Sequence, residues 1–287
     1  MGSALKHNEA ISSDTTPIGK RLLAAGMLIV SALSSHAKAE LEPAQTGLTA
    51  GANTAATGFF NPAGMTRVAN TEAVGDVIAF YAESDFELQA GSWVGAGTTV
   101  SNDEWVAVPG AFFVKPFARN WRFGMGLSVP TGFGSDWGEN WAGRYIVQES
   151  TWLVVRFMPS LAYRIGENLS LGAGLTLDYT AAQSKSAVRN VEGPDGQAVL
   201  ETDGWALGYS LSALYEFSPR TRVGLVYTSE NEPELEGNPE FNNIGPVRES
   251  LLRAAGIWDQ SIEVTSRTED GADRYLARLR QRGVFDG

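Results

Sequence analysis

Residues 168–181 read NLSLGAGLTLDYTA, with large apolar residues alternating with small or polar ones. Leu, Ala and Tyr occupy one set of alternate positions, whereas Ser, Gly, Thr and Asp occupy the other. Successive side chains of a strand point to opposite faces, so the pattern predicts a β-strand with one apolar and one polar face. The run is longer than the usual strands of soluble sheets and is long enough for a tilted strand to cross a membrane.

Similar alternation recurs along most of the chain. Clear runs lie at 121–129, 153–164 and 204–217, and weaker ones at 73–82, 105–115 and 221–229. The connections alternate between short (117–120, 166–167, 218–220) and long (83–104, 130–150, 182–203, 230–261). Short turns at one end and long loops at the other are typical of outer-membrane β-barrels. A secreted β-sandwich, with the apolar faces turned into a core, is the alternative.

The N-terminus carries the pattern of a secretory signal peptide. An apolar run at 22–33 follows Lys20 and Arg21 and precedes Ala37-Lys38-Ala39, a small-residue cleavage pattern. The run is too short for a membrane-spanning helix, which needs about 20 residues. We therefore expect residues 1–39 to be an N-terminal extension with a signal peptide, a buried helix being the alternative.

Composition excludes several classes of function. The formal balance of 22 basic against 33 acidic residues gives a net charge of -11, which argues against binding to nucleic acid. The chain has no Cys, and its two His residues, His7 and His36, both lie before the expected cleavage site. The mature chain therefore lacks the residues of Ser-His-Asp, Cys-His and zinc chemistry. We expect no catalytic residues, metal or cofactor.

The remaining chain divides into three parts. Residues 40–72 are rich in Gly, Ala, Thr and Asn and have too few large apolar residues to form their own core. We expect this segment to pack inside the barrel formed by residues 73–268. Residues 269–287 contain four arginines and no alternation, so they are expected to form a tail outside the barrel.

Two expected external loops carry apolar stripes. Phe133, Trp137, Trp141 and Tyr145 are each four residues apart, which would place them on one face of a short helix. Val247, Leu251, Ala255 and Trp258 have a similar spacing. Such stripes either pack loop against loop or line a groove for an apolar ligand, and the two roles are compatible if the stripes face each other.

Several charged residues fall on the polar, inward-facing side of the predicted strands. Arg122 and Arg156 are the candidates to bind the carboxylate of a fatty acid through bidentate hydrogen bonds. The alternative is that these arginines pair with inward Asp or Glu residues and only fill the lumen.

One motif brings a family resemblance. Residues 56–65 read ATGFFNPAGM, and the segments PTGFG (130–134), WAGRY (141–145) and PSLAY (159–163) follow. Together they resemble the FadL/TodX family of outer-membrane transporters for fatty acids and aromatic hydrocarbons. The resemblance implies an all-β, transmembrane antiparallel barrel of fourteen strands, plugged by an N-terminal hatch that includes Asn61, Pro62 and Ala63.

The resemblance also implies a passive route and the partners of the protein. The ligand is caught in a groove among external loops, passes to a pocket inside the barrel and leaves sideways through an opening in the wall. By loop position, Phe133, Trp137, Trp141, Tyr145 and Leu251 are the groove candidates. The expected partners are a fatty acid or other hydrophobic molecule and outer-membrane lipid, and the expected state is a monomer in the Gram-negative outer membrane.

The sequence departs from the family pattern at its C-terminal end. We count seven clear strands and one weak strand at 261–268, and find no terminal strand that ends in an aromatic residue. A truncated or frame-shifted product would have this pattern. Two other functions compete with transport, namely an eight-stranded barrel with a structural or adhesive role and an outer-membrane enzyme. The missing histidines argue against the enzyme.

Overall fold

The computed structural model describes residues 48–87, 100–258, 260–269 and 272–281, so the expected signal peptide lies outside the described residues. The strands are β1 (Glu72–Phe86), β2 (Val100–Pro116), β3 (Trp121–Asp136), β4 (Glu149–Ile165), β5 (Leu169–Val188), β6 (Gly196–Ser218), β7 (Thr221–Thr228), β8 (Glu234–Asn242), β9 (Gln260–Glu269) and β10 (Ala272–Gln281). The helices are α2 (Leu48–Gly51), α3 (Thr57–Phe60), the 3-10 helix η1 (Pro62–Arg67) and α4 (Pro246–Ala254).

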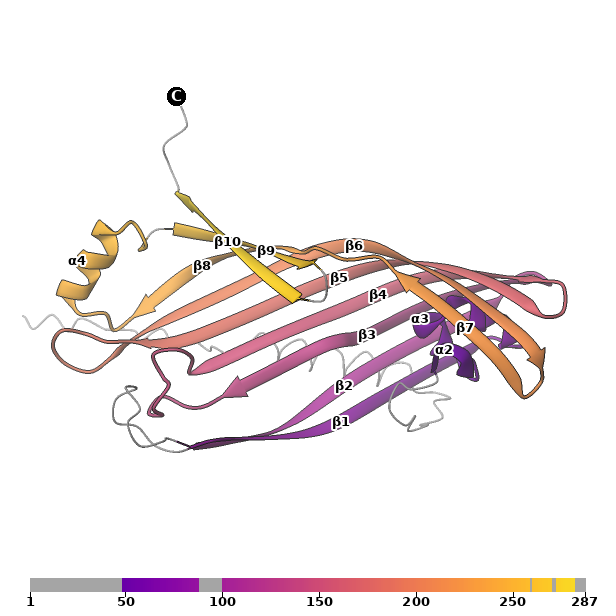
Figure 1. Cartoon of the computed structure of the whole chain (residues 1–287), viewed down its shortest axis with the longest axis horizontal. Coiled ribbons are helices and arrows are strands. Elements are labelled where there is room, and N and C mark those ends of the chain that lie inside the picture. Colours follow the sequence, from indigo (N-terminus) through magenta and orange to yellow (C-terminus); the bar gives the residue numbers. More distant parts are fainter. Residues whose placement is uncertain (1–47, 88–99, 259, 270–271, 282–287) are drawn as a thin grey trace, which may run out of the picture.

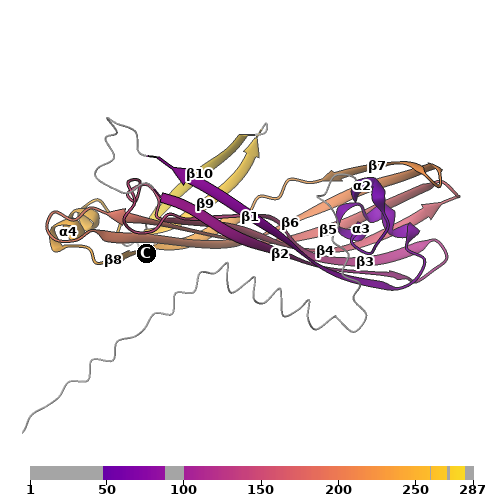
Figure 2. The same cartoon turned by 90° about the horizontal axis from the view of Figure 1, so that it is seen from below.

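The strands form one antiparallel sheet of ten strands, in the order β1-β2-β3-β4-β5-β6-β8-β9-β10, with β7 also paired to β6. The sheet is long and curved, like part of a barrel wall (Figures 1 and 2). β7 pairs with Ser210–Ser218 of β6, and β8 pairs with Gln197–Asp203 of β6, both in the antiparallel sense. β7 and β8 therefore follow one another along the same edge of β6, with an interruption between them. No helix in the described part of the chain is long and apolar enough to cross a membrane.

Burial in this sheet is inverted relative to that of a soluble protein. On the apolar face, Leu207 and Leu225 are 73% and 68% exposed, whereas on the polar face Thr176 and Ser170 are 0% and 1% exposed. In a soluble β-sandwich the apolar face would be covered by a second sheet, but the described strands all belong to one sheet. The exposed apolar face is that of a transmembrane barrel wall, so the fold class is confirmed and the sandwich alternative is wrong.

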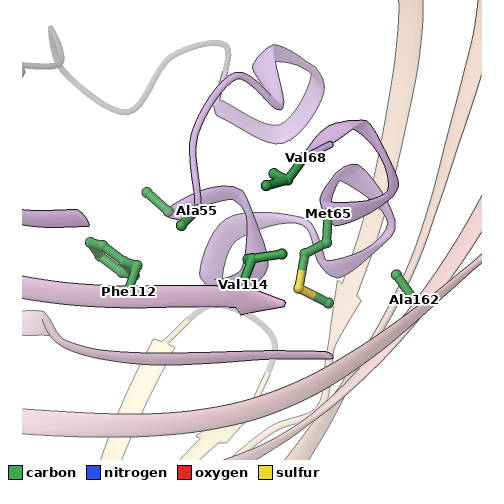
Figure 3. Packing of buried hydrophobic residues seen from close by; sticks show 7 residues of the cluster. Ala55, Met65, Val68, Phe112, Val114 and Ala162 are labelled. Atoms are coloured by element: carbon green, nitrogen blue, oxygen red, sulfur yellow. The ribbon is translucent and has the colours of Figure 1, made fainter. Parts of the chain in front are cut away.

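The segment from Leu48 to Val68 packs against the polar face, near the ends of the strands that are joined by short turns. Met65 of η1 points toward Val114 of β2 and Ala162 of β4 in an apolar cluster (Figure 3). η1 contacts β3, β4, β5 and β6. Because the strands present small residues at these positions, including Gly124 and Gly172, the segment can approach the sheet closely.

The number of strands and the loop lengths differ from the sequence-based expectation of seven or eight strands. β8 lies within the predicted long loop at 230–261, and β10 lies within the expected tail and pairs with β9 along ten positions. β5 and β6 also continue to pair through Val188 and Gly196, inside another predicted loop. Backbone pairing needs no apolar alternation, so strands that extend beyond the apolar belt leave no period-two signal in the sequence.

Candidate functional site

The wall of the sheet opens between β2 and β3. These strands pair only from Gly110–Ser128 to Pro116–Arg122, although β2 begins at Val100 and β3 continues to Asp136. Pro109 directly precedes the last paired position of β2, and Pro130 lies within a register shift between β3 and β4. Because proline has no backbone N–H to donate, both residues favour the end of a ladder. The Ser128 hydroxyl, which donates to the Pro109 carbonyl at 3.3 Å, marks the fork.

A cavity of about 450 Å³ lies at this fork. It is lined from three strands, by Asn102, Asp103, Glu104, Val106, Ala107 and Val108 of β2, by Val129, Gly132, Phe133, Gly134, Ser135 and Asp136 of β3, and by Glu149, Thr151, Trp152 and Leu153 of β4. The rings of Phe133 and Trp152 stack at 6.4 Å with an interplanar angle of 6°. The volume falls within the range of small-molecule sites, and its walls combine apolar, aromatic and acidic side chains.

The predicted hatch residues contact the sheet directly. Asn61, Pro62 and Ala63 are all buried at the start of η1. The Ala63 N–H donates to the Asn61 side chain at 3.1 Å and to the Ser212 hydroxyl of β6 at 2.9 Å. Gly172 of β5 lies beneath this turn, where a β-carbon would overlap the backbone of Pro62 and Ala63.

Ion pairs and hydroxyl contacts hold the rest of the segment. Arg67 forms an ion pair with Glu216, and the hydroxyls of Thr66 and Ser170 lie 2.7 Å apart. Arg122, one of the two predicted carboxylate partners, instead donates to the Val68 carbonyl at 2.9 Å. Its guanidinium therefore anchors the C-terminal end of this segment.

The second predicted carboxylate partner is also engaged. Arg156 donates two hydrogen bonds of 2.7 Å to Asp178, which lies directly opposite it on β5. Asn231, between β7 and β8, donates to the same carboxylate at 2.6 Å and to the Thr176 hydroxyl at 3.1 Å. Asn231 could not be recognised from the sequence, because the interruption after β7 lies within the long connection predicted at 230–261.

The prediction of a helical aromatic stripe is wrong. Phe133 lies in β3, and Trp137, Trp141 and Tyr145 lie in the irregular connection to β4. Trp137 and Trp141 do stack, at 5.2 Å, but Trp141 is only 6% exposed and its indole N–H donates to the Val147 carbonyl. The structure therefore brings Phe133 to the cavity, whereas Trp141 packs within its own loop and against Phe86 of β1, with the ring centres 5.0 Å apart.

Tyr145 belongs to a polar cluster between two external connections. Its hydroxyl donates to Asp195 at 2.7 Å, and Arg144 donates to the same carboxylate at 3.1 Å. The guanidinium groups of Arg144 and Arg189 lie 4.5 and 5.2 Å from the centre of the Tyr145 ring. Burial alone would raise the pKa of Asp195, but the hydrogen bonds from Tyr145 and Arg144 outweigh it and hold the pKa below its usual range.

Leu251 lies on α4, so a helix does form in the second predicted stripe. Val247 and Leu251 are 54% and 55% exposed, and Trp258 stacks on Phe241 at 5.1 Å. The helix is held to the β5–β6 connection by Arg248, which donates to the Arg189 carbonyl at 3.0 Å.

Comparison with known proteins gives a consistent family match. A family model described as "Outer membrane protein transport protein (OMPP1/FadL/TodX)" matches residues 22–264. The long-chain fatty acid transport protein of Escherichia coli O6:H1 is 28% identical over 167 residues, which cover 48% of this chain and 37% of that protein. The 47 kDa outer membrane protein of Pasteurella multocida is 26% identical over 266 residues, covering 85% of this chain and 61% of that protein.

The fold has a matching counterpart among solved structures. The crystal structure of a Pseudomonas aeruginosa FadL homologue aligns with a TM-score of 0.54 and 18% identity, covering 78% of this chain and 58% of that chain. At this identity the likeness concerns the fold alone. The chain spans between 37% and 61% of the length of the two sequence relatives described above.

Proposed function

Because this chain belongs to the OMPP1/FadL/TodX family of outer-membrane transport proteins, we propose that it passively conducts hydrophobic small molecules, long-chain fatty acids being one class, through a barrel plugged by its N-terminal segment. Family members are transport proteins of the Gram-negative outer membrane, not enzymes. The family match also favours transport over a purely structural or adhesive role.

The observation that carries this proposal is the opening between β2 and β3. A hydrophobic molecule that has crossed the polar outer surface of the membrane reaches the bilayer most easily through a gap in the wall, because it then avoids water. The fork at Gly110 and Ser128 supplies such a gap, and the cavity beside it is lined by valines and two stacked aromatic rings. In our proposal this cavity is the last site occupied before the ligand leaves sideways.

The N-terminal segment has the properties that a hatch requires. It lies against the polar face near the short turns, which in outer-membrane barrels face the periplasm. Its anchors are hydrogen bonds and ion pairs to several different strands, including Ala63 to Ser212 and Arg67 to Glu216. In this role Asn61, Pro62 and Ala63 close the periplasmic end of the lumen, so the ligand is directed toward the wall opening.

The proposed external groove is formed by side chains of the β3–β4 connection and of α4. Phe133 lines the cavity, and Trp137 stacks on Trp141 in the connection that follows β3. Trp141 and Tyr145 support the shape of that connection. Leu251 and Val247 offer an exposed apolar surface on α4. We propose that ligand first contacts the exposed Phe133, Val247 and Leu251 and the half-buried Trp137, with Trp141 and Tyr145 acting as structural residues.

Uptake by whole cells tests the proposed function. The full chain is expressed in a Gram-negative strain that lacks its own transporter of this family, and uptake of labelled oleate and of labelled toluene is compared with that of cells carrying the empty vector. We expect faster uptake of at least one compound. Unchanged uptake of both, with the protein present in the outer membrane in a heat-modifiable form, would contradict the proposal.

A further inference from the structure

A second cavity, of about 390 Å³, lies among the connections at the end of the sheet that carries the long loops (Figure 1), and we call it the loop cavity. The β3–β4 connection supplies Glu139, Asn140, Arg144 and Gln148 to its lining, the β5–β6 turn and the start of β6 supply a second wall, and Asn243, which follows β8, supplies a third. In outer-membrane barrels the long loops are external. The loop cavity shares no lining residue with the cavity at the fork between β2 and β3, so it is a separate site.

Hydrogen bonds fix the three walls of the loop cavity relative to one another. The β3–β4 connection is joined to β5 by the Gln148 N–H, which donates to the Lys185 carbonyl at 2.6 Å. Asn190 links the other two walls, because its side-chain amide nitrogen donates to the carbonyls of Pro194 and Asn243 at 2.7 and 2.9 Å. A cavity whose walls are already fixed loses little free energy in ordering them when a ligand binds.

The charged groups that line the loop cavity have partners. Arg144 donates to Asp195 at 3.1 Å, and the Glu139 carboxylate lies 4.0 Å from the ammonium nitrogen of Lys185. Across the described residues, no group of three or more His, Cys, Asp or Glu side chains could hold a metal ion. The lining therefore gives neither an anion nor a cation an unpaired counter-charge.

Most of the other polar groups in the lining are side-chain amides. The Gln197 amide nitrogen donates to the Gln148 side-chain oxygen at 3.1 Å, so these two amides are joined. Asn140 and Asn243 are exposed, and within the described part of the chain their side chains make no hydrogen bond. Each of these two amides therefore keeps one acceptor oxygen and two N–H donors for a ligand.

Neutral hydroxyl groups match this lining better than apolar or ionic groups. A hydroxyl both donates and accepts, so one amide can bind two neighbouring hydroxyl groups of a ring, one through its N–H and the other through its oxygen. An apolar ligand would instead displace water from the amides without replacing its hydrogen bonds, which costs free energy for each group. The volume of the loop cavity is within the range of small-molecule sites.

From this lining we propose that the loop cavity binds a sugar ring, with the side chains of Asn140 and Asn243 hydrogen-bonded to its hydroxyl groups. This site goes beyond the transport of hydrophobic molecules and is independent of the wall opening. The sugar ring is either free in solution or part of the lipopolysaccharide that surrounds the barrel, and both sources present the same hydroxyl groups.

Two probes distinguish these sources, namely D-glucose and the lipid-free, dephosphorylated core oligosaccharide of lipopolysaccharide. Their binding to the full chain is measured by saturation-transfer NMR titration, in a polyoxyethylene detergent whose head group contains no sugar. The test variant is N140A/N243G, in which glycine suits the φ of 53° at Asn243 and so avoids backbone strain. We expect the variant to bind about tenfold more weakly whichever probe the unmodified chain binds, because two hydrogen-bonding amides are removed.

The matched control is N238A, which removes an exposed amide from β8 outside the loop cavity and should leave the affinities unchanged. A loss seen with glucose identifies a site for a free sugar, and a loss seen with the oligosaccharide alone identifies a site for lipopolysaccharide. If neither probe binds, or if N140A/N243G binds as tightly as N238A, the proposal is wrong. Uptake of oleate and toluene should be the same in N140A/N243G as in the unmodified chain, so failure of the sugar site leaves the proposed transport function standing.

Discussion

Asp178 accepts two hydrogen bonds from Arg156, each 2.7 Å long, from directly across the β4–β5 ladder. The side chains are 5% and 20% exposed, so the pair is largely removed from water. Asn231 adds a third hydrogen bond to the same carboxylate and holds the interruption between β7 and β8 against the polar face. Arg156 is therefore part of the wall structure and is not free to receive a ligand carboxylate.

Removing the charge of Asp178 should destabilise the sheet. In Asp178→Asn the guanidinium of Arg156 loses its counter-charge in a mostly buried position, which costs about 2 to 4 kcal/mol in the free energy of unfolding. Urea unfolding in lipid vesicles, followed by tryptophan fluorescence, measures this cost. The double variant Arg156→Leu/Asp178→Leu should lose less stability than Arg156→Leu and Asp178→Leu lose in sum, and strict additivity would argue against a coupled pair.

Filling the space at Gly172 should displace the hatch while leaving the strands in place. The β-carbon of Gly172→Val would overlap backbone atoms of Pro62 and Ala63, which cannot move as a flexible side chain can. We expect faster proteolysis between residues 48 and 68, with heat-modifiable mobility retained. Gly51→Ala is the matched control, since nothing lies within 4 Å of the added carbon. Equal protection of the segment in all three proteins would be inconsistent with the described packing.

Acid should loosen the connection between β5 and β6. The folded pKa of Asp195 is depressed, because hydrogen bonds from Tyr145 and Arg144 outweigh the effect of burial. Because the folded pKa lies below the unfolded pKa of about 4, ionised Asp195 stabilises the fold at pH values above the unfolded pKa. This stability is lost as the pH falls through the folded pKa. Hydrogen exchange of residues 189–195 should therefore increase below about pH 4, after correction for the intrinsic rates. In Asp195→Asn the corrected rates should be high at every pH and lack this step.

One prediction concerns the signal peptide, which lies outside the described residues. Ala37-Lys38-Ala39 follows an apolar run, so we expect cleavage after Ala39 and a mature protein that begins at Glu40. N-terminal sequencing of protein purified from the outer membrane checks this expectation. A start more than a few residues away would exclude this cleavage site.

The main strands could be predicted from the sequence because their two faces meet different surroundings. In β5, Leu171 and Leu175 face outward and are exposed, whereas Thr176 faces the buried polar side. The contact of Asn61–Ala63 with the polar face could be anticipated only through the family motif, because its partners, Ser212 and Gly172, are more than a hundred residues away along the chain.

Other features had an ambiguous signal or none. A spacing of four residues fits both the helical period and the two-residue period of a strand, so Phe133 could be assigned to either, and pairing with Trp152 places it in β3. β8 lacks apolar alternation because it pairs with β6 beyond the apolar belt. The fork between β2 and β3 did leave a signal in Pro109 and Pro130, two residues without an N–H close to the last paired positions.

The most direct test of the account blocks the opening between β2 and β3. Gly134 lines the cavity, and a β-carbon there would meet its neighbours at 3.5 Å or more, so the backbone accepts a side chain at this position and Gly134→Trp adds an indole at the opening. Val191→Trp, in the exposed connection after β5, adds the same ring away from the cavity. The measurement is the uptake rate of the labelled compound that the unmodified chain takes up fastest, at equal outer-membrane abundance. We predict that Gly134→Trp reduces uptake to the level of the empty vector while Val191→Trp does not. Undiminished uptake by a correctly assembled Gly134→Trp protein would contradict the wall opening as the exit.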